Sequence, residues 1–333
     1  MVSDKAGWCL LGALALVSLS CGGPPHAAEE KYFLIATNIK LPYWQAAGAG
    51  LRAAAVQLGV KCDFVGPDTY DPRAQQEEFR RVMAQKPTGI LVSAADPELM
   101  NAEIDRAIAQ GIPVITIDSD APASQRLLFI GTNNSEAGSM GARVTAAKLG
   151  GKGNVVVYTM PEQVNLAERL HGYRDGFGAH PQIKIAEIIN VRGDPRIAFD
   201  KTTEIVTKRK PLPDAFICLE ATACEEVAEV LDRQRVLGKV VVAMDADRGT
   251  LEWIQKGVIA ATIAQKPYTM AFVGLKMLDD LHHHKLAPLA GQWAQNPFAP
   301  IPTFVDTGAT LIDNRNVNRF FEAQQSATEK RGG

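Results

Sequence analysis

The chain has 333 residues, more than one domain usually contains, so two domains of middling size are expected. Hydrophobic residues make up 46% of the chain and charged residues 22%, which excludes intrinsic disorder and a membrane-embedded body. The formal net charge of -2 likewise gives no basis for a nucleic-acid partner.

The N-terminus has the pattern of an export signal. Lys5 precedes an uncharged, mostly apolar stretch over residues 6–20, which is shorter than the roughly 20 apolar residues that a bilayer crossing needs. Residues 16–21 read LVSLSC and resemble the lipobox of bacterial lipoproteins, in which the cysteine is acylated after cleavage. The pattern predicts that the protein is exported.

Two ways of processing this leader are open. In the first, residues 1–20 are a signal peptide, Cys21 carries a lipid, and residues 21–30, which contain a Gly-Gly-Pro-Pro run, are a tether. In the second, the leader is cut near Ala28 and no lipid is added. Both place the protein outside the cytoplasm.

After the leader, short apolar runs alternate with segments of helical periodicity, such as the one containing Trp44, Ala47, Leu51 and Ala55. Continuous apolar runs are typical of parallel strands that are covered on both faces. The expected strands are Tyr32–Thr37, Cys62–Val65, Gly89–Val92, Val114–Ile117, Asn154–Thr159, Ile185–Val191, Ala215–Cys218, Val240–Met244 and Ala260–Ile263. The pattern restarts after residue 153, so we expect an α/β protein with two doubly wound parallel-sheet lobes.

Two adjacent aromatic residues, Tyr43 and Trp44, follow the first expected strand. Aromatic faces stack on the C–H faces of sugar rings and lose little conformational entropy on binding. Trp44 also has the spacing of a core residue of the next helix, so packing and ligand contact are both open for it.

Two aspartates stand directly after expected strands, Asp118 after 114–117 and Asp245 after 240–244. Ligands of open α/β sheets bind beyond the carboxyl ends of the strands. A carboxylate there can accept charge-assisted bonds from two neighbouring hydroxyls. The alternative is that each aspartate caps the next helix, but two in equivalent places favour ligand contact.

Of the five cysteines, Cys9 and Cys21 lie in the leader, which leaves Cys62, Cys218 and Cys224 in the body. Three is an odd number for a disulfide framework. Cys218 ends an expected strand and Cys224 lies on the following helix, so we expect small buried thiols.

Two further motifs do not support an enzyme. The glycine-rich residues 150–153 precede a strand instead of joining a strand to a helix, so they cannot cradle a dinucleotide pyrophosphate. His282, His283 and His284 point in different directions on a helix and lack the i, i+4 histidine pairing of zinc helices, which favours a basic C-terminal turn. We expect no enzyme, no cofactor and no metal.

The body from Lys31 to Ala323 resembles the type I periplasmic binding proteins of the ribose-binding kind. The stretches that carry the resemblance follow one another in family order: 111–118 (GIPVITID), 130–134 (IGTNN), 169–173 (RLHGY), 244–245 (MD) and 259–265 (IAATIAQ). Together they span nearly the whole body and are specific for the family.

The resemblance implies a site in which aromatic rings sandwich the ligand and polar side chains bind its hydroxyls. The residues at matching positions are Tyr43, Trp44, Asp118, Asp245 and Gln265. Glu220 lies where ribose binders hold an asparagine, and Ser119 stands where they place an arginine beside the aspartate. These departures give a more acidic pocket, which suits another sugar, a polyol or a positively charged ligand better than ribose.

Ser119, Asn165, Arg169 and Glu220 complete the expected ligand-binding set. Asn165 and Arg169 can supply donors. For Arg169 a role as a structural partner inside its lobe is the alternative.

The resemblance also implies three chain crossovers between the lobes, near Asn133, Gln265 and Thr303, which form a hinge. The expected domains are therefore an N-terminal lobe over 31–132 plus 266–303, a C-terminal lobe over 133–265 plus 304–323, and a flexible tail over 324–333. Closure of the lobes buries the ligand and presents a surface to a transporter.

The function that these features predict is a periplasmic solute-binding lipoprotein of an ABC importer that captures a small sugar or polyol. We expect a monomer that touches the membrane only through its lipid, with an ABC permease as partner and no nucleic acid. The alternative is a ligand-sensing lipoprotein that feeds a chemoreceptor or a sensor kinase. Sugar-responsive repressors share the fold, but they carry a helix-turn-helix where this chain has its apolar leader.

Overall fold

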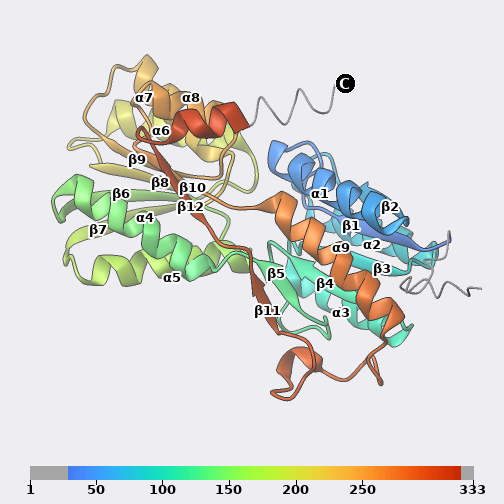
Figure 1. Ribbon diagram of the computed structural model, residues 1–333. Helices are drawn as coiled ribbons and strands as arrows, with labels where there is room; N and C mark the ends of the chain where they lie inside the picture. The colour runs from blue at the N-terminus through green and yellow to red at the C-terminus, as the bar shows by residue number, and fades with distance from the viewer. Residues whose placement is uncertain (1–28, 324–333) are drawn as a thin grey trace, which may run out of the picture.

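The computed structural model describes residues 29–323, which form two lobes, each with a six-stranded sheet covered by helices on both faces (Figure 1). The first sheet has the order β2-β1-β3-β4-β5-β11, with β1 Lys31–Ile35, β2 Lys61–Val65, β3 Gly89–Val92, β4 Val114–Ile117, β5 Phe129–Gly131 and β11 Phe304–Asp306. The second has the order β7-β6-β8-β9-β10-β12, with β6 Lys152–Thr159, β7 Gln182–Asn190, β8 Ala215–Cys218, β9 Val240–Met244, β10 Ala261–Ala264 and β12 Thr310–Asp313.

The two sheets have the same strand order, position by position, which confirms the prediction of two doubly wound α/β lobes. All pairings within them are parallel except that of β10 with β12. The strands β3, β4 and β8 are buried along their whole length, as expected for apolar strands between two helix layers.

Helices pack in pairs on the sheets. On the first sheet α1 (Pro42–Leu58) lies beside α9 (Pro267–His283), and α2 (Pro72–Ala84) lies beside α3 (Pro97–Ala109) on the opposite face (Figure 1). On the second sheet the pairs are α4 (Asn134–Leu149) with α5 (Val164–Gly178), and α6 (Pro195–Lys208) with α7 (Ala223–Arg233), next to which lies α8 (Arg248–Gln255). A short 3-10 turn, η1, spans Trp293–Gln295.

Three helices begin with the same local signal, an aspartate followed by proline. Asp71, Asp96 and Asp194 each accept a hydrogen bond from a backbone N–H of the first helical turn. The proline after each needs no hydrogen-bond partner for its nitrogen, so Asp-Pro starts a helix efficiently. Asp194 therefore has a capping role at the start of α6.

The chain crosses between the lobes three times, after β5, after β10 and after β11 (Figure 1). The strands β5, β11 and β12, which lie at these crossovers, are short and were not among the expected strands. Because β11 pairs with β5, residues 304–306 belong to the first sheet, and the third crossover comes at 307–309, slightly later than expected.

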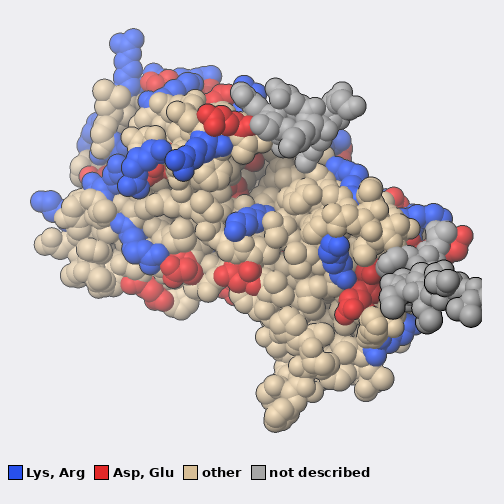
Figure 2. All heavy atoms as spheres, viewed as in Figure 1, with Lys and Arg blue, Asp and Glu red and all other residues tan. Residues whose placement is uncertain are grey.

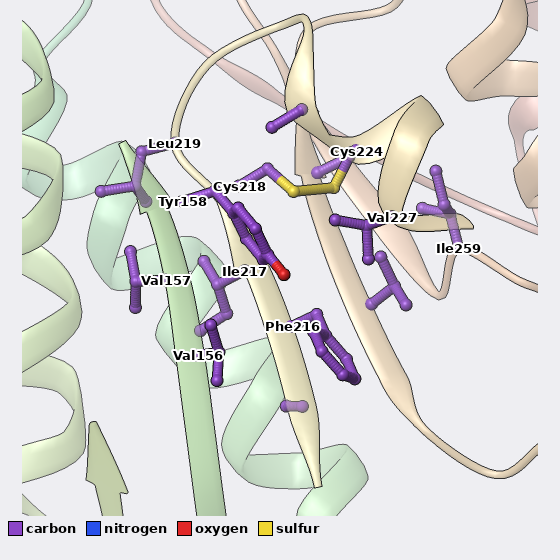
Figure 3. Packing of buried hydrophobic residues seen from close by; sticks show 14 of the residues in the cluster. Val156, Val157, Tyr158, Phe216, Ile217, Cys218, Leu219, Cys224, Val227 and Ile259 are labelled. Carbon is purple, nitrogen blue, oxygen red and sulfur yellow. A yellow bond between two sulfur atoms is a disulfide. The ribbon is translucent and has the colours of Figure 1, made fainter. Parts of the chain in front are cut away.

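The expectation of free buried thiols at Cys218 and Cys224 is wrong, because these residues form a disulfide (Figure 3). It joins the end of β8 to the first turn of α7, and the loop between them contains Glu220. Among the described residues Cys62 remains a free thiol. The three cysteines of the body thus form one disulfide and leave one free thiol, so an odd number of cysteines does not exclude a disulfide.

The predicted signal peptide 1–20, the lipidation site Cys21 and the tail 324–333 lie outside the described residues. Glu30, which was assigned to the tether, is buried against the body. Within residues 29–323 no helix is both long and apolar enough to span a bilayer. Lys and Arg are interspersed with Asp and Glu over both lobes on the face shown in Figure 2, in keeping with the small net charge.

Candidate functional site: a polar pocket between the lobes

A pocket with about 560 Å³ of empty space lies where the strand ends of the two lobes face each other. Its lining includes eight of the nine expected ligand-binding residues, namely Tyr43, Trp44, Asp118, Asn165, Arg169, Glu220, Asp245 and Gln265. Ser119 is the exception: it is buried, and it lies behind the pocket rather than in its lining. The rest of the lining is Thr37, Asn38, Leu41, Tyr70, Met160, Gln163, Leu166, Gly193, Ala221 and Thr222.

Asp118 and Asp245 occupy equivalent places in the two lobes. Each follows the fourth strand of its sheet, β4 or β9, and has a positive φ, of 63° and 69° respectively. The N–H of each donates to the neighbouring strand, Asp118 to the Ile130 carbonyl at 3.0 Å and Asp245 to the Ile263 carbonyl at 2.9 Å. Non-glycine residues with positive φ are uncommon and concentrate at functional sites.

Helix capping, the alternative reading of these aspartates, is not what the structure shows. The residue at the N-cap of α8 is Asp247, and the carboxylate of Asp245 is instead bound by a pocket side chain. After Asp118 the chain runs on to β5 without an intervening helix. Both carboxylates are thus directed into the pocket.

The Asp118 carboxylate receives three side-chain donors. The Tyr43 hydroxyl donates to Oδ1 at 2.5 Å, and the Ser93 hydroxyl and the Asn165 amide donate to Oδ2 at 3.3 and 3.4 Å. Asn165 lies on α5 of the second lobe, whereas Asp118 and Tyr43 belong to the first. The two lobes therefore touch across the pocket through this carboxylate.

Within the described residues, the Asp245 carboxylate accepts a hydrogen bond from a single side chain, Gln265, which is itself held by Arg169. Gln265 donates from Nε2 to Asp245 Oδ1 at 3.0 Å and accepts a bond from Arg169 at 2.8 Å. The other Arg169 donors reach the Leu219 carbonyl at 2.7 Å and Asn134 Oδ1 at 2.9 Å. Arg169 is only 2% exposed and all these partners lie in or beside its own lobe, which supports the structural role.

Glu220 lines the pocket but uses its carboxylate to cap α7. It accepts bonds from the Thr222 N–H and hydroxyl, both at 2.6 Å, and from the Ala223 N–H at 2.8 Å. The disulfide between Cys218 and Cys224 encloses this turn. Glu220 lies in the lining of the pocket, while the hydrogen bonds of its carboxylate resemble those of a helix N-cap.

Burial raises the pKa of four carboxyl groups in or beside the pocket. Burial, reinforced by the nearby Asp247 charge and opposed by Arg169, raises the pKa of Asp245 to about 7. Burial also raises the pKa of Asp247 to about 6, with help from Glu225 and Glu220. For Asp118 and Glu220 burial likewise raises the pKa, and Arg169 opposes the shift in both.

The aromatic wall consists of three rings, one of which was not expected. Tyr43 and Trp44 meet edge to face with ring centroids 5.2 Å apart, and Trp44 both packs in the first core and lines the pocket. Tyr70, in the turn between β2 and α2, adds a third ring. Because the turn follows a strand, the same strand-end rule that selected Asp118 selects this turn as well.

Tyr70 also bridges the lobes. Its hydroxyl donates to the Ala95 carbonyl of the first lobe at 2.8 Å, while its ring packs against the core of the second. At Gly193 of the second lobe an added Cβ would lie 2.4 Å from Tyr70 Cβ. Only glycine permits this approach.

Residues next to the expected site have structural roles. Asp120 forms an ion pair with Arg126 and accepts the Thr116 hydroxyl at 2.6 Å. This pair lies in a second hollow beside the first crossover and does not line the pocket.

Residues 32–285 match the family model described as periplasmic binding protein domain. The chain belongs to this family. Its curated relatives include the D-allose-binding periplasmic protein of Escherichia coli, 26% identical over 82% of this chain and 91% of the relative, and the ribose import binding protein of Bacillus subtilis, 25% identical over 83% and 90%.

A solved arabinose-binding protein from Geobacillus stearothermophilus is similar in structure, with a TM-score of 0.73, 31% identity, and coverage of 87% of this chain and 99% of that one. Members of the family are extracytoplasmic substrate-binding proteins of transport systems and not enzymes. The predicted resemblance to the ribose-binding kind is confirmed.

Proposed function

We propose that the protein captures a monosaccharide or a polyol by closing its two lobes around it, and delivers it to an ABC importer. The observation that carries this proposal is the pairing of Asp118 and Asp245, which enter one pocket from equivalent strand ends of opposite lobes. Each carboxylate can accept bonds from two adjacent hydroxyls, which is the donor pattern of a sugar or polyol.

The lining of the pocket supports the same ligand class. Polar side chains of both lobes converge on it beside apolar and aromatic surface, as is usual for small-molecule sites. The rings of Tyr43, Trp44 and Tyr70 provide apolar surface for C–H faces. Relatives that bind allose, ribose or arabinose are similar to nearly the whole body, and this supports the class of ligand rather than one sugar.

Contacts between the lobes support the closure. The bond from Asn165 to Asp118 and the contact of Tyr70 with Gly193 both join the lobes at the pocket. Three crossovers link the lobes on one side, so rotation about them would open the pocket and break both contacts. A ligand that contacts both lobes would favour the closed form.

A binding screen tests the proposal. Thermal shift across aldoses, ketoses, polyols and small amines should identify a stabilising ligand, because a ligand of the native state raises the melting temperature. Calorimetry should then give one site per chain. Ligand binding should also change the tryptophan fluorescence, and this change should be lost in Trp44→Phe and kept in Trp253→Phe, because Trp253 lies on α8 away from the pocket. Binding of no sugar or polyol would contradict the proposal, and an unchanged response in Trp44→Phe would contradict the contact between Trp44 and the ligand.

We further propose that Cys21 carries the lipid anchor. The support is the LVSLSC sequence before the Gly-Pro-rich residues 22–25. Radiolabelled palmitate should label the wild type and the Cys9→Ser variant but not Cys21→Ser, which tests the two leader cysteines against each other. Labelling that survives Cys21→Ser, or a soluble periplasmic wild-type product, would count against the anchor.

A further inference from the structure

A cluster of two carboxylates and one imidazole lies in the first lobe, far from the pocket. Glu30 immediately precedes β1, and Asp279 and His283 lie one turn apart at the end of α9. Since α9 begins at Pro267, just after the second crossover, and has 17 residues, its far end is about 25 Å from the hinge. The cluster is therefore independent of the ligand site.

The three ligand atoms lie close enough together for side-chain adjustments to place them around one metal ion. His283 Nε2 lies 3.3 Å from Glu30 Oε2 and 3.7 Å from Asp279 Oδ1, and all three atoms lie within 4.8 Å of one another. A tetrahedral ion with bonds of about 2.0–2.2 Å holds its ligand atoms roughly 3.3–3.6 Å apart. Small side-chain adjustments would bring all three to this spacing.

Burial and charge add a second argument. Glu30 is 6% exposed, Asp279 is 7% exposed, and the side chain of His283 is 14% exposed. The Tyr32 hydroxyl, at 3.5 Å from Glu30 Oε2, faces the same carboxylates. A divalent cation bound between the three side chains would pair with two buried carboxylates and one imidazole nitrogen.

We propose that Glu30, Asp279 and His283 form a binding site for a divalent transition-metal ion of the zinc type. One imidazole nitrogen with two carboxylate oxygens suits zinc better than calcium or magnesium, which prefer all-oxygen shells. The ion would join the start of β1 to the end of α9, next to the segment that leads from the N-terminus. Its role would be structural.

The site uses one member of the run His282-His283-His284. None of these histidines has another histidine four residues away, so the run lacks the histidine pair of a zinc helix. On α9 the residue four positions before His283 is Asp279, a carboxylate ligand, so the i, i+4 pair exists with a different residue type.

Zinc titration of the protein without a polyhistidine tag, after dialysis against a chelator, tests the proposal. Calorimetry should give one zinc ion per chain, and zinc should raise the melting temperature. His283→Ala should weaken binding by about 100-fold or more, since loss of even an outer-shell partner costs up to about 100-fold. The matched control is His284→Ala, the exposed neighbour that bonds to Asp280, and it should bind as the wild type does.

Two results would overturn the site. One is the absence of saturable zinc binding to the wild type, which would make the cluster a hydrogen-bonded triad. The other is binding that survives His283→Ala but is lost in His284→Ala, which would assign the zinc to the exposed histidines. If His283→Ala does not fold, X-ray absorption of the zinc-loaded wild type decides: one imidazole with carboxylate oxygens supports the site, and several imidazoles refute it.

Discussion

The two lobes place an aspartate at the same point of the same topology, yet they surround it differently. Asp118 follows β4 and accepts three side-chain hydrogen bonds, one of them from the opposite lobe. Asp245 follows β9 and, among the described residues, its carboxylate accepts one, from Gln265. Backbone geometry is shared, whereas the side-chain partners are not.

This difference predicts different roles for the two aspartates. The bond from Asn165 makes Asp118 part of the contact between the lobes, and the bond from Tyr43 fixes the same carboxylate within its own lobe. Asp245 keeps acceptor capacity for ligand hydroxyls at the cost of a poorly compensated buried charge, which is reflected in its pKa of about 7. We therefore expect Asp118 to affect stability and closure, and Asp245 to affect affinity.

The largest effect should come from removing the cation that both aspartates share. Arg169 opposes the rise in the pKa of Asp118, Asp245 and Glu220, and it also holds Gln265. Arg169→Met should lower the free energy of unfolding by about 3 kcal/mol, because the buried acceptors and charges lose their partner. Urea unfolding measures the loss, and Arg174→Met, exposed on the same helix, should change little. Equal stability of the two variants would contradict the role assigned to Arg169.

The next effect separates the two aspartates. At pH 8, Asp245→Asn should weaken ligand binding by about 100-fold, since charge-assisted bonds contribute about 1.5–3 kcal/mol each, and should leave stability unchanged or higher. Asp118→Asn should lower the melting temperature, because it disturbs three hydrogen bonds. Calorimetry and thermal melts give both quantities.

The control for this pair is Asp247→Asn, which makes the same charge change two residues further along, outside the pocket lining. It should bind with wild-type affinity at pH 8. If Asp245→Asn bound equally well, the hydroxyl-acceptor role of Asp245 would be wrong.

A smaller effect is expected where the lobes meet. Gly193→Ala would place a Cβ 2.4 Å from Tyr70 Cβ, so the lobes could not close fully, and affinity should fall by about tenfold or more. Gly238→Ala provides a close control: both glycines have positive φ, 69° and 73°, but nothing lies within 4 Å of the Cβ added at Gly238. Both variants carry the backbone strain, and only the first blocks closure. Equal calorimetric affinities for the two would exclude Tyr70 and Gly193 as a closure contact.

The sequence was sufficient for most of the fold and for most of the pocket. Four expected strands, including β4 and β9, match the structure residue for residue, because a continuous apolar run that is buried on both faces has sharp ends. Asp118 and Asp245 could be found because parallel strands end at one edge of a sheet. The strand β5 has only three residues, and β11 and β12 are short and only partly buried, so none of the three forms a clear apolar run.

What the sequence could not reveal depends on distant contacts. The disulfide between Cys218 and Cys224 depends on a tight turn that brings their Cα atoms to 5.6 Å. Ser119 was included by its match to a family position, but it is buried and does not line the pocket. Tyr70 was missed because the strand-end rule was not applied after β2.

The effect most specific to Asp245 is its response to pH. The carboxylate form accepts ligand hydroxyls, so binding should lower its pKa from about 7, and affinity should fall as the pH drops from 8 to 5.5, by up to about tenfold per unit. The ligand-free protein should respond in the opposite sense. Its folded pKa lies above the unfolded value of about 3.9, so protonation of Asp245 stabilises the fold as the pH falls from 7 toward 4.

Because Asp118 and Glu220 also have raised pKa values, a second variant is needed to assign this response. The Asp247 charge contributes to the raised pKa of Asp245, so Asp247→Asn should move the midpoint of the affinity profile to lower pH without changing the plateau at pH 8. Calorimetry at half-unit pH steps measures both profiles. An affinity that is flat between pH 8 and 5.5 would show that the ligand does not depend on an ionised Asp245. An identical midpoint in Asp247→Asn would assign the profile to another carboxyl group, such as Asp118 or Glu220, and the difference between the two aspartates would then be one of geometry alone.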